Sequence, residues 1–493
     1  MNFISGQMVL CTAIFTLVYA IGFMVSFFSQ AMGFVFGILA IGAFLVVYRD
    51  IRILVLFLIV LNLGIIPPES RPGFLLAGGP VFLSDILLGI VLMTSLVDGA
   101  FTGTRKTGPP NVMGVLIIAF YFLAAVSFLI SLFLMKNEPG SVLGDLKDLL
   151  NYLVFFIILA YYQDEKRIRD LVSFVCILAL LVSLVSLVQY FTGLDLIYSK
   201  KSISMKIGST VYQDISRQKT HGDDIAFFAV FYCLALLFGS KIRINIGDAI
   251  ISFLIIISGC LLLIVTFLRG IYISFFICLF LLVLLTPDKK KLILIGCGAI
   301  PLITGLFIFL MIYPGSSTFT GALFDRVASI SKEQTYTTDY SMQWRVFETQ
   351  KAIETLQSHP FTGAGFGGEY HDVDKFINAG RYIHNGYLFI ALKMGLQGLC
   401  LFLIICMVYL YRTLRLIWRM RGQPDQIIAT TAFLYFGGLM IASLVRPNFS
   451  NGKTVLFIGV VWGITECLGI VFAEGKAPFV SPEQGAPAPK IAD

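Results

Sequence analysis

Charged residues are scarce in this sequence. They make up 13% of the 493 residues, against 57% apolar residues, and the mean hydropathy is +0.88. Soluble domains usually carry about 25% charged residues. The composition therefore excludes an ordinary soluble globular protein.

Disulfide and metal frameworks are also missing. All nine cysteines fall within apolar runs, and none lies in the two long polar segments at 191–222 and 313–383. This distribution excludes a disulfide framework or a CxxC metal site. His371 with Asp372 and Asp374 could ligate a metal ion, but no further convincing ligand stands at a fixed spacing from them. We expect neither a metal nor a cofactor.

Long apolar runs dominate the sequence instead. A membrane-spanning helix needs about 20 mostly apolar residues. We therefore predict an all-α fold, a polytopic helical membrane protein with about 12–14 transmembrane helices and one large external, periplasmic loop. We expect the first run to be a membrane helix rather than a cleavable signal. The fourteen candidate spans are 8–28, 31–48, 53–66, 81–97, 112–135, 148–162, 171–191, 224–240, 249–267, 271–286, 292–312, 386–411, 426–445 and 454–472.

Lysine and arginine set the predicted orientation, because they accumulate in short cytoplasmic loops. With both termini in the cytoplasm, the short loops on that side hold sixteen of them and the short opposite loops hold six. This assignment puts segments 191–222 and 313–383 outside. Four regions follow: scaffold helices at 1–190, a core at 191–412 that includes both external segments, C-terminal helices at 413–472, and a disordered cytoplasmic tail at 473–493.

The larger external segment contains a predicted helix after Tyr340, with Arg345 on it. Proline disfavours helix in the residue before it, so the helix should end at His359, before Pro360. We expect its apolar stripe to lie against the membrane surface or the helix bundle. The stripe consists of Met342, Val346, Ile353 and Leu356.

A glycine cluster follows this helix. Its backbone N–H groups could bind an anion as a nest does, with Gly363 and Gly365 as supporting residues. A plain flexible turn is the alternative.

Further polar residues stand where apolar runs begin or end. His384 and Asn385 precede one run, and Arg269 interrupts another. Charge at such a depth is costly and marks function by default, although Arg269 could instead reach water from a tight helical hairpin. Arg217 lies in the first external segment, where an arginine is usually just solvated.

Taken in order, these residues resemble a known family. Arg345, HPFTGAGFG (359–367), HNGYL (384–388) and MGLQG (394–398) are similar to the signature that bacterial O-antigen ligases and O-antigen (Wzy-type) polymerases carry in one large periplasmic loop.

Two more arginines extend the resemblance, which covers roughly residues 210–410. Arg269, within TFLRG, is similar to the family's arginine after a helix end. Arg217 resembles its arginine before the preceding span. Leu268 stands where the family usually has a serine.

The resemblance implies a reaction. Family members transfer a glycan from an undecaprenyl diphosphate carrier to an acceptor hydroxyl, outside the inner membrane and without a metal. The planar fork of arginine suits diphosphate oxygens, so Arg217, Arg269 and Arg345 are the expected diphosphate-binding residues. Histidine can act as a base near neutral pH. His384 is therefore the expected catalytic base, with a structural role as the alternative, and direct displacement would invert the anomeric carbon.

Two classes of function fit these residues. The first is this inner-membrane glycosyltransferase. Its expected partners are a lipid-linked oligosaccharide or polysaccharide, an acceptor glycan and the bilayer, with a flippase and a chain-length regulator as protein partners and no nucleic acid. The second is a non-catalytic transporter or flippase of lipid-linked saccharide, in which charges should line a path through the bilayer. Intramembrane charges are few, Lys393 and Glu466 among them, which favours the enzyme.

Within the enzyme class, the long chain and large external segment favour a polymerase of surface-polysaccharide repeat units. The alternative is an O-antigen ligase that attaches finished polymer to lipid A core.

Overall fold

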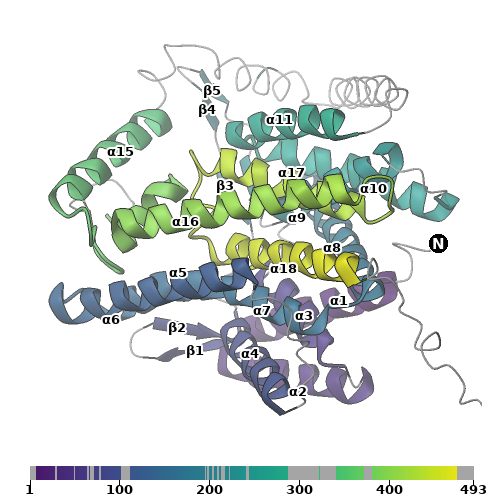
Figure 1. Cartoon of the computed structure of the whole chain (residues 1–493), viewed down its shortest axis with the longest axis horizontal. Coiled ribbons are helices and arrows are strands. Elements are labelled where there is room, and N and C mark those ends of the chain that lie inside the picture. Colours follow the sequence, from purple (N-terminus) through teal and green to yellow (C-terminus); the bar gives the residue numbers. More distant parts are fainter. Residues whose placement is uncertain are drawn as a thin grey trace, which may run out of the picture.

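The chain folds into a bundle of helices. The computed structural model describes residues 7–27, 30–48, 50–63, 66, 71–76, 79–101, 111–194, 196, 199–202, 205–207, 210–212, 217–220, 222–239, 244–286, 321, 340–370 and 380–474. Most helices in this part of the chain lie roughly parallel to one another (Figure 1). The predicted all-α membrane fold is confirmed.

Thirteen of the fourteen predicted spans overlap a helix. The exception, 292–312, lies outside the described residues. The first helices are α1 (Met8–Phe27), α2 (Gln30–Tyr48), α3 (Arg52–Asn62), α4 (Leu83–Phe101), α5 (Val112–Leu129), α6 (Pro139–Leu150), α7 (Val154–Tyr161) and α8 (Glu165–Thr192). The later ones are α9 (Asp223–Leu234), α10 (Ile246–Val265), α11 (Arg269–Leu285), α15 (Tyr340–Ser358), α16 (Gly386–Arg419), α17 (Gln426–Ala442) and α18 (Gly452–Glu474).

Short strands in the described residues form three antiparallel pairs. They are β1 (Gly73–Leu76) with β2 (Gly79–Phe82), β3 (Ser199–Ser202) with β6 (Arg217–Thr220), and β4 (Met205–Ile207) with β5 (Thr210–Tyr212). The last two pairs lie in the first external segment.

The helices differ in how much membrane they can cross. In the part of the chain that the structure describes, five stretches are long and apolar enough to span it: Val112–Leu134, Glu165–Thr192, Ile246–Val265, Gly386–Arg419 and Gly452–Ala473. In contrast, α3 has 11 residues and rises only about 16 Å, short of the roughly 30 Å hydrocarbon core. The predicted span at 148–162 begins earlier and is broken, since α6 and α7 are joined by a 3₁₀ turn at Asn151–Leu153.

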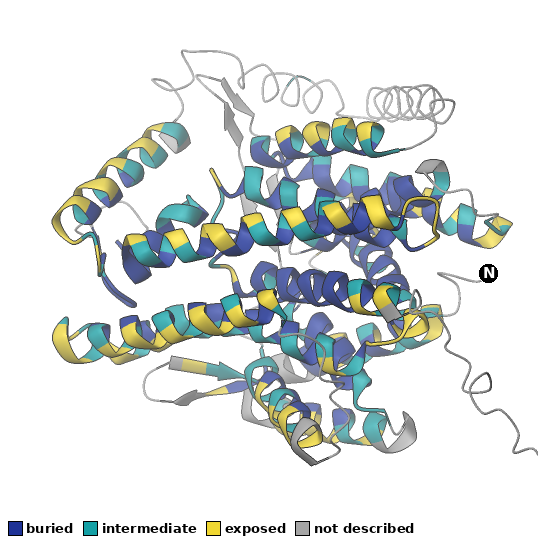
Figure 2. Cartoon of the chain, in the orientation of Figure 1, coloured by how far each residue is buried: buried dark blue, intermediate teal, exposed yellow. Residues whose placement is uncertain are grey.

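The core of the bundle surrounds α18. This helix packs against α7, α8, α9 and α17, and 78% of its most apolar window is buried, compared with 28% for Val112–Leu134. Figure 2 shows the same contrast between a buried α18 and an exposed α5. Phe122 and Phe133 are 72% and 73% exposed, so this stretch presents an apolar face that suits lipid.

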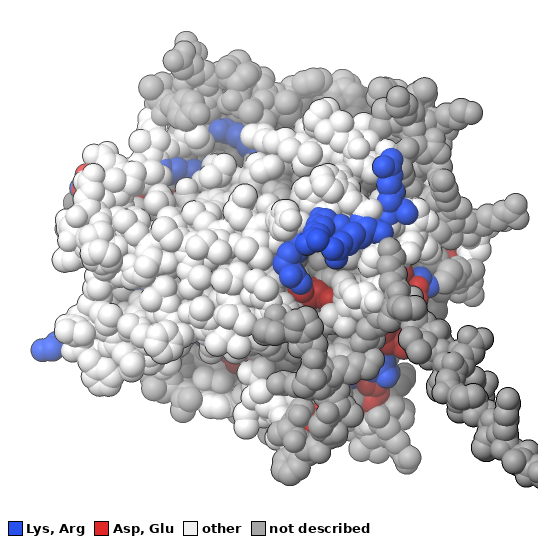
Figure 3. Space-filling model, in the orientation of Figure 1, with Lys and Arg blue, Asp and Glu red and all other residues white. Residues whose placement is uncertain are grey.

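Ion pairs gather at both ends of α16. At its C-terminal end Arg412 pairs with Glu466 (Nε–Oε1 2.8 Å), and nearby Arg169 pairs with Asp425 (Nε–Oδ1 2.8 Å). Lysine and arginine side chains gather over the same end (Figure 3). The positive-inside rule predicts that this end faces the cytoplasm.

The opposite end of α16 is broken at Gly395, where φ is +73°. The loop that follows α15 is bonded to this break. The Leu396 N–H donates to the Pro360 carbonyl (2.8 Å). Lys393 is 1% exposed and its Nζ lies 2.9 Å from Asp145 Oδ2 and 3.0 Å from the Gly368 carbonyl. The buried charge thus has partners, and it joins the loop to α16 and α6.

Candidate active site

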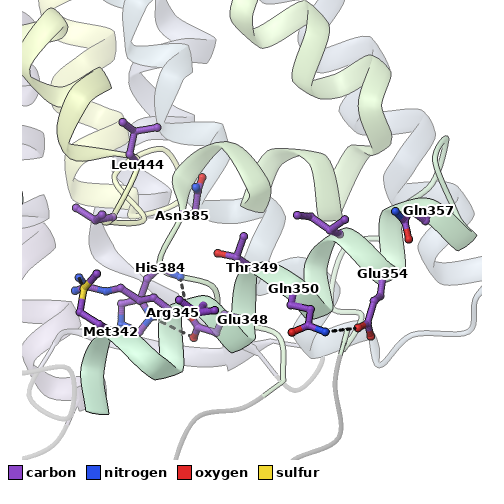
Figure 4. Close-up of a pocket in the computed structure, with 13 residues that line it drawn as sticks. Met342, Arg345, Glu348, Thr349, Gln350, Glu354, Gln357, His384, Asn385 and Leu444 are labelled. Carbon is purple, nitrogen blue, oxygen red and sulfur yellow. Dashed lines mark hydrogen bonds and ion pairs between the residues drawn. The ribbon is translucent and has the colours of Figure 1, made fainter. Parts of the chain in front are cut away.

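A cleft of about 570 Å³ lies at the end of the bundle opposite the C-terminal end of α16, where the lysine and arginine side chains gather. One wall is α15. The other is formed by His384 and Asn385, which precede α16, and by Leu444 and Val445, which follow α17. Figure 4 shows the side chains that line it.

His384 contacts a carboxylate inside this cleft. Its Nδ1 lies 2.8 Å from Oε2 of Glu348, and its backbone N–H donates to the same oxygen at 3.2 Å. An ionised carboxylate only accepts hydrogen bonds, so this contact favours the neutral tautomer of His384 that has its proton on Nδ1 and the lone pair on Nε2. The contact therefore leaves Nε2 as the nitrogen that can accept a proton.

Glu348 is 1% exposed. An unpaired buried carboxylate would be costly, but Trp344 Nε1 also donates to its Oε1 at 2.7 Å. Indole, imidazole and backbone donors thus hold the carboxylate in place. Glu348 is fixed before it meets any ligand.

Arg345 lines the same cleft, one helical turn before Glu348. Its side chain is half-buried. The cleft therefore combines the guanidinium of Arg345 with a histidine that contacts a carboxylate, and Figure 4 shows the three side chains close together. An anion and a proton-donating hydroxyl could be bound side by side there.

The predicted helix over this region is confirmed, with its end at Ser358, and Leu356 of its predicted apolar stripe is buried. Val346 and Ile353 are 54% and 45% exposed and line the cleft. The buried positions are Glu348, Ala352 and Leu356. Glu348 can be buried on this helix because its carboxylate finds hydrogen-bond donors inside the protein.

Asn385 fixes the start of α16. Its side chain accepts from the backbone N–H groups of Tyr387 and Leu388 at 2.9 and 3.1 Å, as an N-cap does. The Gly386 N–H donates to the Ser443 carbonyl at 2.8 Å. These bonds hold His384 at a rigid helix mouth.

Arg269 lies beside the cleft and not in its lining. It begins α11, which packs against α17. A Cβ built on the next residue, Gly270, would lie 2.8 Å from Val445, which does line the cleft. The structure thus brings Arg269 to the same end of the bundle as His384 and Arg345.

Arg217 begins β6, where it pairs with Ser202 of β3. Three residues after this strand, α9 begins at Asp223. Asp223 Oδ2 accepts from Arg446 at 2.8 Å, and Arg446 directly follows Val445 of the cleft wall. Through α9 and the pair of Asp223 with Arg446, the strand is therefore connected to the residues beside the cleft.

The glycine cluster is bonded within the protein. The N–H groups of Ala364 and Gly365 donate to the Leu392 carbonyl (2.8 and 3.1 Å), and that of Gly363 donates to the His359 carbonyl (2.8 Å). These amides are therefore engaged with the break in α16 and with the end of α15. Gly363 and Gly365 thus hold this loop against α16 and the end of α15.

Tyr382 stands next to the histidine. The two rings meet edge to face with centroids 5.0 Å apart. Burial, with the nearby Glu348 adding to it, raises the pKa of Tyr382 to about 12. Tyr382 therefore keeps its hydroxyl proton at neutral pH.

Sequence reasoning missed Glu348 and Arg446. A signal for Glu348 was available, because Arg345, Glu348 and Ala352 are spaced three and four apart and share a helical face. No sequence spacing could indicate the pair of Arg446 with Asp223, since 223 positions separate them.

Among the described residues, no group of three His, Cys, Asp or Glu side chains could hold a metal ion. His371, Asp372 and Asp374, and also His221, lie outside those residues.

Comparison with known proteins covers most of this cleft. Residues 251–403 match the family model described as O-Antigen ligase. The matched region contains Arg269, Arg345, Glu348 and His384, so the resemblance seen in the motifs is confirmed there. No curated protein matches the chain.

Proposed function

We propose that the cleft of this helical membrane protein transfers a glycan between lipid-linked and acceptor saccharides, a proposal supported by the match of residues 251–403 to the family model described as O-Antigen ligase. The donor is an undecaprenyl diphosphate-linked oligosaccharide or polysaccharide. The acceptor is a sugar hydroxyl on the periplasmic face of the inner membrane. The product we favour is a polymer of repeat units of a surface polysaccharide.

In the proposed reaction His384 Nε2 takes the acceptor hydroxyl proton. The acceptor oxygen forms a bond to the anomeric carbon while the bond from that carbon to the diphosphate oxygen breaks. The configuration is inverted. Glu348 accepts from Nδ1 and stabilises the imidazolium that forms, as the carboxylate does in other His–carboxylate pairs.

The diphosphate leaves with its negative charge, which arginine can neutralise with paired N–H groups. We assign this task to Arg345, which lines the cleft, and to Arg269 beside it. Arg217, on β6, completes the proposed set.

The observation that carries the proposal is the contact of His384 with the buried Glu348 in a cleft that also contains Arg345. A flippase needs no base with a fixed tautomer. In agreement with the enzyme, the buried Lys393 and Glu466 have partners and form no charged path among the described residues.

Two variants test these roles. His384→Ala should lower transfer about 10² to 10⁴-fold and still bind the lipid-linked donor. Arg345→Lys should weaken donor binding, because lysine keeps the charge but loses the fork. Both assays use the full-length protein with EDTA present, since no metal takes part in the proposal.

The opposite pattern would contradict the assigned roles, namely donor binding lost with His384→Ala and kept with Arg345→Lys. Transfer at the normal rate by both variants would contradict the proposed function itself.

Ligation of polymer to lipid A core is the second candidate, favoured by the description of the matching family. The lipid-linked intermediates in a deletion strain separate the two. Accumulated single repeat units indicate a lost polymerase, whereas accumulated long chains indicate a lost ligase.

A further inference from the structure

The cleft has a second part that the proposed chemistry leaves unused. Beyond the end with Arg345 and His384, α15 presents a polar row, defined as Gln350, Glu354 and Gln357. The spacing of four and three residues puts the row on one face of the helix. Figure 4 shows it leading along α15 away from His384.

The dimensions fit an extended ligand. At 1.5 Å per residue, the row starts about 8 Å along the helix from Arg345 and runs for about 10 Å. The cleft volume, about 570 Å³, lies within the range of about 300–1,000 Å³ for small-molecule sites. A group bound along the row would thus be continuous with one at His384.

The charge along the row does not suit a diphosphate. Arg345 is the basic residue of the cleft lining, and it lies at the other end. The carboxylate in the row, Glu354, bonds to Gln350 Nε2 at 3.2 Å and pairs with Lys351 at 2.7 Å. Lys351 also lowers the pKa of Glu354. An ionised carboxylate would repel a second anion and accept hydrogen bonds from hydroxyl groups.

The row alternates with apolar surface. Ile353 is 45% exposed between Gln350 and Gln357, and Leu444 on the facing wall is 58% exposed. Amide groups that donate and accept, a carboxylate that accepts and nearby apolar side chains match a sugar, which carries hydroxyl groups around apolar C–H faces.

We propose that the polar row of α15 is the subsite for the acceptor saccharide and positions its hydroxyl at His384. This inference rests on the proposed glycosyl transfer. In this inference the cleft binds the diphosphate at its Arg345 end and neutral sugar along the polar row.

The test measures binding of two soluble probes to the full-length protein by ligand-observed NMR. One probe is the free repeat-unit oligosaccharide, released from the lipid carrier of the native host by mild acid, and the other is inorganic pyrophosphate. Gln350→Ala combined with Gln357→Ala should weaken oligosaccharide binding about tenfold or more, since two hydrogen bonds are lost, and leave pyrophosphate binding unchanged. Arg345→Ala should weaken binding of pyrophosphate.

A matched control removes Gln343 and Ser358, which lie on the same helix outside the cleft lining. This pair of alanine substitutions should leave both probes bound as in the wild type. The inference is overturned if the Gln350 and Gln357 variant binds oligosaccharide normally. It is also overturned if this variant loses binding of undecaprenyl phosphate, which carries no sugar, since a lipid chain would then lie along the polar row.

The acceptor subsite and the proposed glycosyl transfer can be contradicted separately. Normal oligosaccharide binding by the double variant, with transfer still lost in His384→Ala, would remove only the acceptor subsite. Normal transfer by His384→Ala and Arg345→Lys would contradict the proposed function on which the subsite depends.

Discussion

Glu348 decides what His384 can do. The carboxylate is buried, is held by Trp344 and lies 2.8 Å from Nδ1. Because the ring can rotate only by breaking this contact, Nε2 stays available for a substrate. In the proposed reaction Glu348 is thus a positioning residue that acts through the histidine.

Replacement of this carboxylate should slow transfer without loss of the donor site. Glu348→Gln keeps the shape but removes the charge that stabilises the imidazolium, so we expect the turnover rate to fall about 10²-fold or more while donor binding stays near normal. Glu348→Asp should retain more activity than Glu348→Gln. Steady-state rates and donor-binding curves of the purified variants measure this.

A matched control is Glu369→Gln, which removes an exposed carboxylate from the same external region. It should transfer at the normal rate. Equal losses in donor binding and turnover for Glu348→Gln would instead mean that Glu348 only holds the helix in place.

Single residues also show the reach of sequence reasoning. His384, Arg345 and Asn385 could be chosen because they stand at helix boundaries or beside a signature, and the structure places all three in one cleft. Glu348 was missed despite its helical spacing from Arg345, because a glutamate on a predicted surface helix is usually a solvated residue. Its burial depends on Trp344 and His384, and the histidine lies 36 positions away.

At the scale of elements, the loop after α15 depends on glycine. Gly363 and Gly395 have φ of +59° and +73°, where other residues are strained. A Cβ at Gly363 would lie 2.2 Å from the Leu392 carbonyl, and one at Gly395 would lie 2.2 Å from the Phe361 carbonyl. Both the loop, at Gly363, and the break in α16, at Gly395, thus need glycine.

Substitution at this joint should loosen α15. We expect Gly363→Ala to destabilise the protein by more than about 1–2 kcal/mol, because the left-handed conformation and the backbone clash add up. The thermal midpoint in detergent should fall, and proteolysis within α15 should become faster. Gly437→Ala is the control. Gly437 lies in α17 with nothing within 4 Å of an added Cβ, so it should be neutral or slightly stabilising. A Gly363→Ala protein as stable as Gly437→Ala would show that the joint tolerates a side chain.

The elements themselves could be predicted better than their joints. Pro360 fixed the end of α15 within one residue of the observed Ser358. The break of α16 at Gly395 was not foreseen, since the apolar run continues through it. Its cause is the Pro360–Gly365 backbone, which bonds to α16 from another part of the chain.

At the scale of the whole molecule, hydropathy locates spans because a bilayer demands apolar length. Hydropathy does not show whether an apolar run crosses the whole bilayer. The eight residues Ile53–Val60 of α3 are all buried, so an apolar run that looks like a span can be a short helix packed inside the bundle. Length and burial, both structural quantities, separate these cases.

Orientation in the membrane gives the last prediction. The cleft and the basic end of α16 lie at opposite ends of the bundle, so from the positive-inside rule we predict that the cleft faces the periplasm. Cysteines introduced at Lys351 and at Gln423, both on the surface and beyond the apolar part of the helices, should differ in intact spheroplasts. An impermeant thiol reagent should label the Lys351→Cys protein and leave Gln423→Cys unlabelled until the membrane is opened. The wild type measures labelling of the native cysteines. Labelling of Gln423→Cys alone would invert the topology, and the active site could then no longer meet substrates on the periplasmic face.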